Sequence, residues 1–266
     1  MSRDRHAGIL RASNSTVMPM VMNIFLAGAA GAVGKPLTSL LVSAGHRVAA
    51  TTRSVGKVEM LRGLGAAPVV VDVFDAAALK QAVAKAKPDI VIHQLTDLPA
   101  GIGAGFDPAL LADALARNAR VRDEGTRNLI AAALAAGVRR VVAQSIAWVY
   151  APGPEPHGEG DALNAPAEGS KGVSMRGVIA LECQVLQTPS IDGLVLRYGQ
   201  LYGPGTGRDH AEGAMPLHVD AAAYAALLAV DKGLPGVFNV AEPNGVIATA
   251  KAQRELGWRG GFRLPG

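Results

Sequence analysis

Three glycines recur at intervals of three residues near the start of the chain. They lie in IFLAGAAGAVGKPL, residues 24–37, between an apolar run and an Ala/Leu-rich stretch. In a strand–turn–helix segment of this kind, Gly28 permits a tight bend, Gly31 lets the backbone approach a pyrophosphate, and Gly34 lets the helix pack on the strand. Backbone N–H groups at the helix N-terminus then favour phosphate oxygens. A close-packed Ala/Gly turn without a ligand is the alternative.

We predict that this turn binds a dinucleotide through its backbone and its small side chains. The spacing is G-x-x-G-x-x-G, which differs from the dehydrogenase form G-x-G-x-x-G. The residues expected to contact the dinucleotide are Gly28, Ala30, Gly31, Ala32, Val33 and Gly34.

A cation follows the second predicted strand, at the place where a site selective for NAD carries an acid. The strand ends in Thr-Thr-Arg-Ser, residues 51–54, and Arg53 offers a planar fork of donors to a ribose 2′-phosphate. Ser54 is expected to bind beside Arg53, and Lys57 to assist. An ordinary surface charge is the alternative for Arg53. We predict that the cofactor is NADP(H) in preference to NAD(H).

The ends of the third and fourth strands supply further expected contacts. Asp72, in VVVDVFD, is expected to accept a hydrogen bond from the adenine amino group, with Val73 beside it. Capping of the next helix is the alternative for Asp72, although Asp75 fits that role better. The fourth strand ends in IVIHQLTDL, residues 90–98, and its last residues are expected to lie over the ribose and pyrophosphate. These residues are Gln94, Leu95 and Thr96.

Short apolar runs alternate with helical stretches from residue 21 onward. Continuous Val/Ile/Leu runs are typical of parallel strands that are buried on both faces. The predicted strands are 21–27, 47–51, 68–73, 89–95, 140–144, 194–198 and 237–240. The predicted helices are 33–44, 56–64, 76–86, 108–136, 174–186 and 220–231. This alternation predicts right-handed crossovers and a doubly wound parallel α/β sheet.

A single domain is expected over residues 21–266. Two stretches rich in Pro, Gly and charged residues, 151–171 and 203–216, are predicted to be loops on the substrate side. Residues 241–266 are expected to form a small C-terminal segment on the same side. Residues 1–20 are predicted to be a disordered extension, and Met18, Met20 or Met22 is an alternative start.

Composition and charge argue against several classes of partner and site. The formal net charge is +4 and no basic run is interleaved with aromatic residues, so nucleic acid is not an expected partner. No stretch reaches the roughly 18 apolar residues that span a membrane. Residues 1–19 also lack the apolar region of a signal peptide, so we predict a cytoplasmic protein. Cys183 is the only cysteine and no histidine lies at metal-ligand spacing, so neither an internal disulfide nor a metal is predicted.

Taken together, several ordered segments resemble the atypical or extended short-chain dehydrogenase/reductase superfamily, the NAD-dependent epimerase/dehydratase group. They are GAAGAVG (28–34), DV (72–73), RDEGTRNLIAAA (122–133), GVRRVVAQS (137–145), LRYGQLYGPG (196–205), HVDAA (218–222) and KAQRELGW (251–258). The resemblance covers roughly residues 22–240. It implies a Rossmann-like fold that binds NAD(P). The stretch 242–249 leads almost directly to the last segment, so the C-terminal substrate lobe is expected to be small and reduced.

The chain departs from this family at the residues that transfer protons. Members use a Tyr-x-x-x-Lys pair, in which the lysine lowers the pKa of the tyrosine. Of the four tyrosines here, none has a lysine four residues later. When the family pattern is matched through Glu182, Ser174 stands at the tyrosine position and Val178 at the lysine position. An ordinary epimerase or alcohol dehydrogenase is therefore not expected.

Ser145 and Tyr198 are the candidates for the chemistry, and both are also expected to contact the cofactor. Counted from Tyr150, the family's catalytic hydroxyl falls nearer Ile146 than Ser145, and Ser145 reaches the nicotinamide only if the strand ends early. A structural hydrogen bond is the alternative for Ser145. Tyr198 ends the sixth strand near the expected nicotinamide, with packing as the alternative. His93 is either an acid–base group or, more typically, a hydrogen-bonded core histidine. One of Arg120 and Arg122 is expected to contact phosphate or substrate, with an exposed helix face as the alternative for both.

Two functions remain open at this point. The first is an NADP(H)-dependent oxidoreductase, or an epimerase/dehydratase-like enzyme, that acts on a small-molecule substrate with a non-standard proton donor. The second is a non-catalytic NADP(H)-binding redox sensor or regulatory protein. Loops that leave a cavity over the nicotinamide favour the enzyme. The Ala/Leu faces of the helix at 108–136 are either core or the seam of a homodimer.

Overall fold

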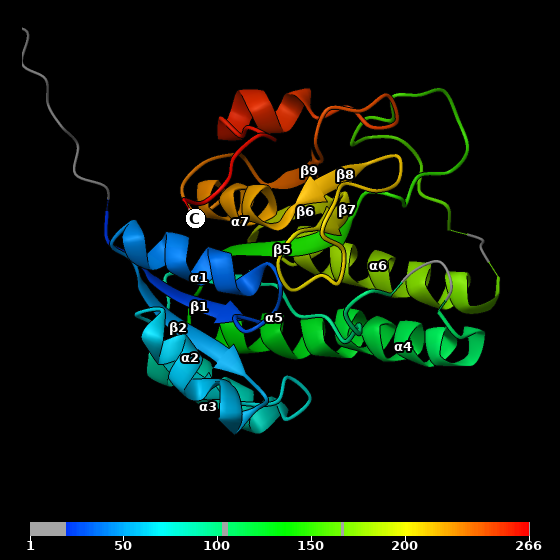
Figure 1. The fold of residues 1–266 in the computed structure, drawn as a ribbon. Helices are drawn as coiled ribbons and strands as arrows, with labels where there is room; N and C mark the ends of the chain where they lie inside the picture. The colour runs from blue at the N-terminus through cyan, green and yellow to red at the C-terminus, as the bar shows by residue number, and fades with distance from the viewer. Residues whose placement is uncertain (1–19, 103–105, 166–167, 266) are drawn as a thin grey trace, which may run out of the picture.

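Seven parallel strands form the central sheet, in the order β3-β2-β1-β4-β5-β6-β9 (Figure 1). The structure is a computed structural model that describes residues 20–102, 106–165 and 168–265. The strands are β1 (Asn23–Ala27), β2 (Arg47–Thr52), β3 (Ala67–Val70), β4 (Ile90–His93), β5 (Arg140–Ile146), β6 (Asp192–Tyr198) and β9 (Gly236–Val240). Two short strands, β7 (Gln200–Tyr202) and β8 (Pro216–His218), pair separately. The predicted α/β class and the seven predicted strands are confirmed.

Helices cover both faces of the sheet (Figure 1). One face carries α1 (Gly34–Ser43), α2 (Val58–Gly63) and α7 (Val219–Leu228). The other face carries α3 (Ala76–Ala86), α5 (Thr126–Ala135) and α6 (Gly169–Gln187), with α4 (Pro108–Arg120) packed beside α6. Short helical turns are η1 (Val55–Lys57), η2 (Val121–Gly125) and η3 (Ala252–Leu256).

Strand β1 explains why the predicted strands read as continuous apolar runs. Successive side chains of a strand point to opposite faces of the sheet. Ile24 and Leu26 therefore pack into the core under α1 and α7, and Phe25 and Ala27 pack into the core under α3 and α5. All four side chains are buried. A strand between two helical layers has no face left for polar residues.

The strand order reverses at β1, and this reversal creates the crevice that matters for function. Strands β2 and β3 lie on one side of β1, and β4, β5, β6 and β9 lie on the other. The chain leaves β1 toward α1 on one face of the sheet and leaves β4 toward α4 on the opposite face. The loops diverge at such a switch point, and open α/β sheets bind their ligands there.

The predicted helix at 108–136 is one helical path with a wide turn in its middle. Helix α4 runs into the π-helical turn η2, which runs into α5. Ala114, Asn118, Arg122 and Thr126 are buried and follow one another at intervals of four residues. In α5, Leu129, Ile130, Ala132 and Ala133 pack in the core shared with α3. The Ala/Leu face of α5 is therefore core, whereas Leu110 of α4 and Leu134 of α5 are exposed, and the homodimer stays a prediction.

Both predicted loops were given C-terminal boundaries that are too late. Helix α6 begins at Gly169, so the last three residues of the predicted loop 151–171 are helical. The predicted loop 203–216 ends at Pro216, which already belongs to β8. The sequence did not reveal β7 and β8, because a strand of three residues is too short to form an apolar run that differs from its surroundings.

Some predictions fall on residues that the structure does not describe. Of the predicted extension 1–20, residues 1–19 lie outside the described residues, as do 166–167 in the first predicted loop. None of the helices in the described ranges is long and apolar enough to cross a membrane. Within the same ranges, His, Cys, Asp and Glu side chains form no group of three or more that could hold a metal ion.

Candidate functional site

A cavity of about 970 Å³ lies along the carboxyl ends of β1, β2, β4, β5 and β6. Its walls come from the glycine turn, the end of β2, the loop after β4, η2, the end of β5, α6 and the loop after β7. The volume is near the upper end of the range for small-molecule sites. The cavity occupies the crevice at the switch point of the sheet.

Two of the three glycines are required by close backbone contacts. Gly28 has a φ of +89°, and a Cβ there would lie 2.4 Å from the carbonyl oxygen of Gln94. A Cβ on Gly34 would lie 2.1 Å from the carbonyl oxygen of Gly28. Gly31 is exposed, and its Cβ would meet only the Gly28 carbonyl oxygen, at 3.3 Å. The turn is thus rigid where it meets the sheet and open toward the cavity.

The predicted turn contacts divide into two groups. Gly28, Ala30, Gly31 and Ala32 line the cavity. Val33 and Gly34 are buried behind the turn, and neither is among the described residues that line the cavity. Their role in the structure is to pack the start of α1 against the sheet.

Cations outnumber acids on the cavity wall. Lys35 lines it near the glycine turn, and Arg53 and Lys57 line it beyond the end of β2. Ser54 also lines this part. The acid on the described wall is Asp97, whose carboxylate lies 3.6 Å from the Arg53 guanidinium and 3.8 Å from that of Arg117.

Asp72 does not reach the cavity. It is exposed, and its Oδ1 accepts a hydrogen bond from the Phe74 backbone N–H at 2.9 Å. Val73 and Phe74 line the cavity in its place. Asp75 caps α3 by accepting from the Ala78 N–H at 2.9 Å, as the sequence indicated.

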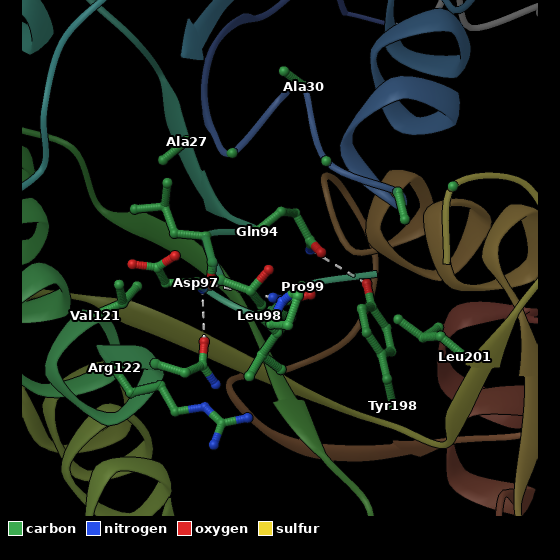
Figure 2. Close-up of a pocket in the computed structure, with 18 of the residues that line it drawn as sticks. Ala27, Ala30, Gln94, Asp97, Leu98, Pro99, Val121, Arg122, Tyr198 and Leu201 are labelled. Carbon is green, nitrogen blue, oxygen red and sulfur yellow. Dashed lines mark hydrogen bonds between the residues drawn. The ribbon is translucent and has the colours of Figure 1, made fainter. Parts of the chain in front are cut away.

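Gln94 and Tyr198 meet at the floor of the cavity (Figure 2). The Gln94 Nε2 donates to the Tyr198 hydroxyl at 3.3 Å, and that hydroxyl donates to the Ala222 carbonyl at 3.1 Å. Burial raises the pKa of Tyr198 above its ordinary value. The Gln94 Oε1 is buried and has no hydrogen-bond partner in the described part of the chain. Leu95 and Thr96 also line the cavity.

Ser145 lies at the cavity wall, but its hydroxyl points into a buried ion-pair network. Strand β5 continues to Ile146, and the Ser145 Oγ donates to Glu182 Oε1 of α6 at 2.7 Å. Arg197 of β6 binds both Glu182 oxygens, through Nε at 3.0 Å and Nη2 at 2.7 Å. Arg197 also donates to the Tyr150 hydroxyl at 2.9 Å. Ser145 therefore makes a structural hydrogen bond in this geometry, which was the alternative to a role in catalysis.

His93 is a hydrogen-bonded core histidine. Its Nδ1 accepts from the Leu95 backbone N–H at 3.2 Å, so the proton of the neutral ring is on Nε2, 3.0 Å from Thr126 Oγ1. Burial, and to a lesser extent the charge of Arg122, lowers the pKa of His93 from 6.5 to about 4. The ring is neutral near pH 7 and lies outside the described cavity wall.

Arg120 and Arg122 differ although only one residue separates them. Arg120 is exposed and forms a two-bond ion pair with Glu124 on its own helical path. Arg122 is buried at the cavity wall, where its Nη1 donates to Ser174 Oγ of α6 at 3.3 Å. The exposed-face alternative therefore holds for Arg120, and Arg122 faces the cavity.

Two loops meet over the cavity and contact one another. Of the predicted loop 203–216, Gly205, Thr206 and Arg208 line the cavity. Gly101 donates its N–H to the Thr206 carbonyl at 2.8 Å, and Arg208 donates to the Ile102 carbonyl at 2.7 Å. The described residues of the other predicted loop, 151–171, do not line the cavity. Of the described residues in the two predicted loops, only those of 203–216 reach the cavity, and the position of both loops on the substrate side stays a prediction.

Sequence reasoning missed several of the cavity residues. They are Lys35, Asp97, Leu98, Pro99, Ala100, Ile102, Asn118, Ser174 as a cavity residue, and Arg208. One signal was present, because Ala114, Asn118, Arg122 and Thr126 share one face of the helix at i, i+4 spacing. Polar residues on a face that is otherwise apolar indicate a buried site. No comparable signal exists for the loop residues.

Comparison with known proteins agrees with this geometry. The model of the NAD dependent epimerase/dehydratase family matches residues 24–237. The chain is 37% identical over 279 aligned positions to a Streptomyces protein described as 3-diazoavenalumate denitrifying reductase, covering 89% of this chain and 88% of that protein.

Solved structures share the fold at lower identity. UDP-glucose 4-epimerase of Thermotoga maritima has a TM-score of 0.71 and 20% identity, with 91% of this chain and 94% of that chain covered. The Bordetella bronchiseptica enzyme WbmG, solved with NAD and UDP, also has a TM-score of 0.71 and 20% identity, with 94% and 92% covered. At this identity the likeness establishes a common fold.

Proposed function

Because the chain belongs to the NAD dependent epimerase/dehydratase family, we propose that it is an NADP(H)-dependent reductase that acts on a small molecule without a tyrosine proton donor. Membership makes it an oxidoreductase- or epimerase-like enzyme with a nicotinamide cofactor. The more specific proposal is supported by the glycine turn, by the cations after β2 and by the hydrogen bonds of the hydroxyl groups in the cavity.

The cavity residues fit a dinucleotide. Gly31 leaves the backbone of the turn open to a pyrophosphate, and the positively charged Lys35 lies beside the turn. Val73 and Phe74 form an apolar wall suited to an adenine ring. When bound, the reduced cofactor supplies a hydride.

The charges after β2 support NADP(H) over NAD(H). Arg53 and Lys57 line that end of the cavity, and no acid occurs between residues 51 and 58. A guanidinium binds a phosphate through two parallel hydrogen bonds, whereas the ribose hydroxyls of NAD require an acceptor there. Asp97 pairs loosely with Arg53, and a 2′-phosphate would compete with it for the guanidinium.

The main support for the proposal is that both candidate proton donors already donate hydrogen bonds to acceptors within the protein. Ser145 donates its proton to Glu182, and Tyr198 donates its proton to the Ala222 carbonyl. Reduction of a carbonyl to an alcohol consumes a proton as well as a hydride, and members with a Tyr-x-x-x-Lys pair supply that proton from the tyrosine. A reaction that needs only a hydride suits this cavity better.

Reductive loss of N₂ from an aryl diazonium ion is such a reaction. Hydride forms the new C–H bond of a diazonium carbon, the C–N bond breaks, and its electron pair leaves with N₂. No general acid is needed. The Streptomyces relative is described as a denitrifying reductase of a diazo compound. We infer that diazo compounds that react as aryl diazonium ions fall within the substrate range of this chain.

The test is a turnover screen with NADPH. The panel contains an aryl diazonium salt, an aldehyde, a ketone and an imine, and loss of NADPH absorbance is followed with heat-denatured protein as the control. We expect turnover of the diazonium salt with release of N₂, and the new C–H hydrogen should derive from labelled NADPH and not from solvent. NADPH binding without turnover of any compound would instead support the non-catalytic sensor.

Variants that lack the two hydroxyl groups test whether either group gives a proton to the substrate. Ser145→Ala and Tyr198→Phe should keep kcat/KM within about threefold of the parent, because neither residue gives its proton to substrate. Loss of general acid–base catalysis costs about a hundredfold or more. A loss of that size in kcat/KM, in a variant that still unfolds at the same temperature as the parent, would show that the hydroxyl group is a proton donor in the reaction.

A further inference from the structure

Arg122 is a buried cation on a helix whose other arginines are exposed. Its residue is 6% exposed, while Arg120 and Arg127 are exposed and form ion pairs with Glu124 and Asp123 of the same helical path. Arg122 lies on the buried face of this path, four residues after Asn118 and four before Thr126. It also lies in η2, and π-helical turns of this kind occur frequently at functional sites.

No carboxylate in the described part of the chain lies within ion-pair distance of Arg122. Its hydrogen-bond partner is Ser174 Oγ, at 3.3 Å. Glu182 acts on it electrostatically, but Arg197 and Ser145 occupy the Glu182 oxygens. Burial lowers the pKa of Arg122 to about 10, so the guanidinium remains charged near pH 7.

A buried charge without a partner is strongly unfavourable, so a ligand that neutralises it gains more than it would at the surface. A guanidinium carries five N–H donors, and the structure uses one of them on Ser174. The remaining donors suit two parallel hydrogen bonds to an oxyanion. Ser174 accepts from Arg122, so its own O–H is available to a second oxygen of the same anion.

The cofactor phosphates are not the anion that Arg122 suits. In Figure 2 the guanidinium and Ala30 of the glycine turn lie on opposite sides of the cavity, with Gln94 and Asp97 between them. Lys35 is next to the turn, and Arg53 and Lys57 are beyond β2. These three cations are distributed where the proposed cofactor carries its phosphates. Arg122 is in a different part of the wall, beside α6.

We propose that Arg122, assisted by Ser174, binds a carboxylate of the substrate, so that the cavity selects small monocarboxylates. The proposal rests on the proposed function, because it takes the part of the cavity beside α6 as the substrate site. A single guanidinium matches a single negative charge, which favours a carboxylate over a phosphate dianion. Arg122 is therefore a specificity residue that holds the substrate without taking part in proton transfer.

Binding of charged and uncharged probes to the NADP⁺-saturated protein tests this proposal. Cinnamate and its neutral amide have the same shape, and their affinities are compared by calorimetry. The parent protein should bind cinnamate at least about tenfold more tightly than cinnamamide, a difference of about 1.4 kcal/mol. In Arg122→Gln that preference should disappear through weaker binding of cinnamate, while cinnamamide and NADP⁺ stay within about twofold. Arg122→Lys should recover part of the preference.

Arg127→Gln is the matched control, because it removes an exposed arginine from the same helical path. It should leave the affinities of both probes and of NADP⁺ unchanged. Equal affinity of the parent for cinnamate and cinnamamide, or no binding of either, would overturn the proposal without any variant. Weaker binding of NADP⁺ to Arg122→Gln would overturn it by making Arg122 a cofactor ligand.

This experiment is independent of turnover. A protein that binds cinnamate through Arg122 but reduces no compound would retain the carboxylate site and lose the reductase assignment. A protein that reduces an aryl diazonium ion without a carboxylate as well as one that carries it, with no effect of Arg122→Gln on KM, would retain the reductase assignment and lose the carboxylate site.

Discussion

Arg53 is the residue on which the proposed cofactor preference depends. Arg53→Gln should raise the Kd for NADPH about tenfold or more and change the Kd for NADH less than about twofold, because a hydrogen bond to a charged group contributes about 1.5–3 kcal/mol. Titration with each cofactor measures both constants. Arg62→Gln, which removes an exposed arginine paired with Glu59, is the control. Equal weakening of both cofactors would contradict the NADP(H) assignment.

His93 makes the stability of the fold depend on pH. The folded protein keeps His93 neutral down to about pH 4, whereas the unfolded chain takes up a proton near the ordinary pKa of 6.5. Stability from this group is therefore complete above pH 6.5 and is lost as the pH falls toward 4. Between pH 7 and pH 5 the loss is about 2 kcal/mol.

Urea unfolding at the two pH values checks this expectation. His93→Gln has no titrating ring, so it should lose about 2 kcal/mol less than the parent over the same interval. It should be less stable than the parent at pH 7, because the bonds to Thr126 and Leu95 are altered. Parallel pH profiles for the two proteins would show that His93 is not the group responsible.

At the scale of the element, the glycine turn must pack closely under α1 and must leave its backbone open to the cofactor, and variants of different glycines separate these two requirements. Gly34→Ala places a Cβ 2.1 Å from the Gly28 carbonyl oxygen, so the turn and α1 must shift at a cost of about 1–3 kcal/mol. Gly31→Ala meets its nearest atom at 3.3 Å, so stability should change by less than about 1 kcal/mol. Its methyl group would, however, occupy the open side of the turn.

We therefore expect Gly31→Ala to weaken NADPH binding about tenfold with the unfolding temperature nearly unchanged, and Gly34→Ala to lower both affinity and unfolding temperature. Thermal unfolding and cofactor titration of the two variants provide the measurements. Full NADPH affinity in Gly31→Ala would mean that the cofactor does not approach the backbone at this turn.

At the scale of the whole molecule, the cavity exists only in the folded chain. Its wall runs from Ala27 to Arg208, and the contact of Gly101 with Thr206 joins loops more than a hundred residues apart. A ligand that binds only the folded state at a hundred times its Kd stabilises it by about 2.7 kcal/mol. NADPH should therefore raise the urea midpoint more than NADH at equal concentration. Equal shifts with both cofactors would argue against selectivity.

The sequence by itself determined the features that depend on neighbouring residues in the chain. Apolar runs predicted the seven strands of the sheet, because buried parallel strands need apolar residues on both faces. Glycine spacing predicted the turn, because only glycine fits the contact of residue 28 with the Gln94 backbone. Asp75 was predicted as a helix cap for the same local reason.

Only the tertiary structure decided where the side chains at the ends of these elements point. Asp72 and Ser145 were both expected at the cofactor. Asp72 instead bonds to the backbone two residues later, and Ser145 turns to Glu182, which is 37 residues away in the sequence. Arg120 and Arg122 were equivalent in sequence terms, but packing against α6 left one in solvent and one at the cavity. The physical reason is that a side chain's direction is set by partners that only folding brings near.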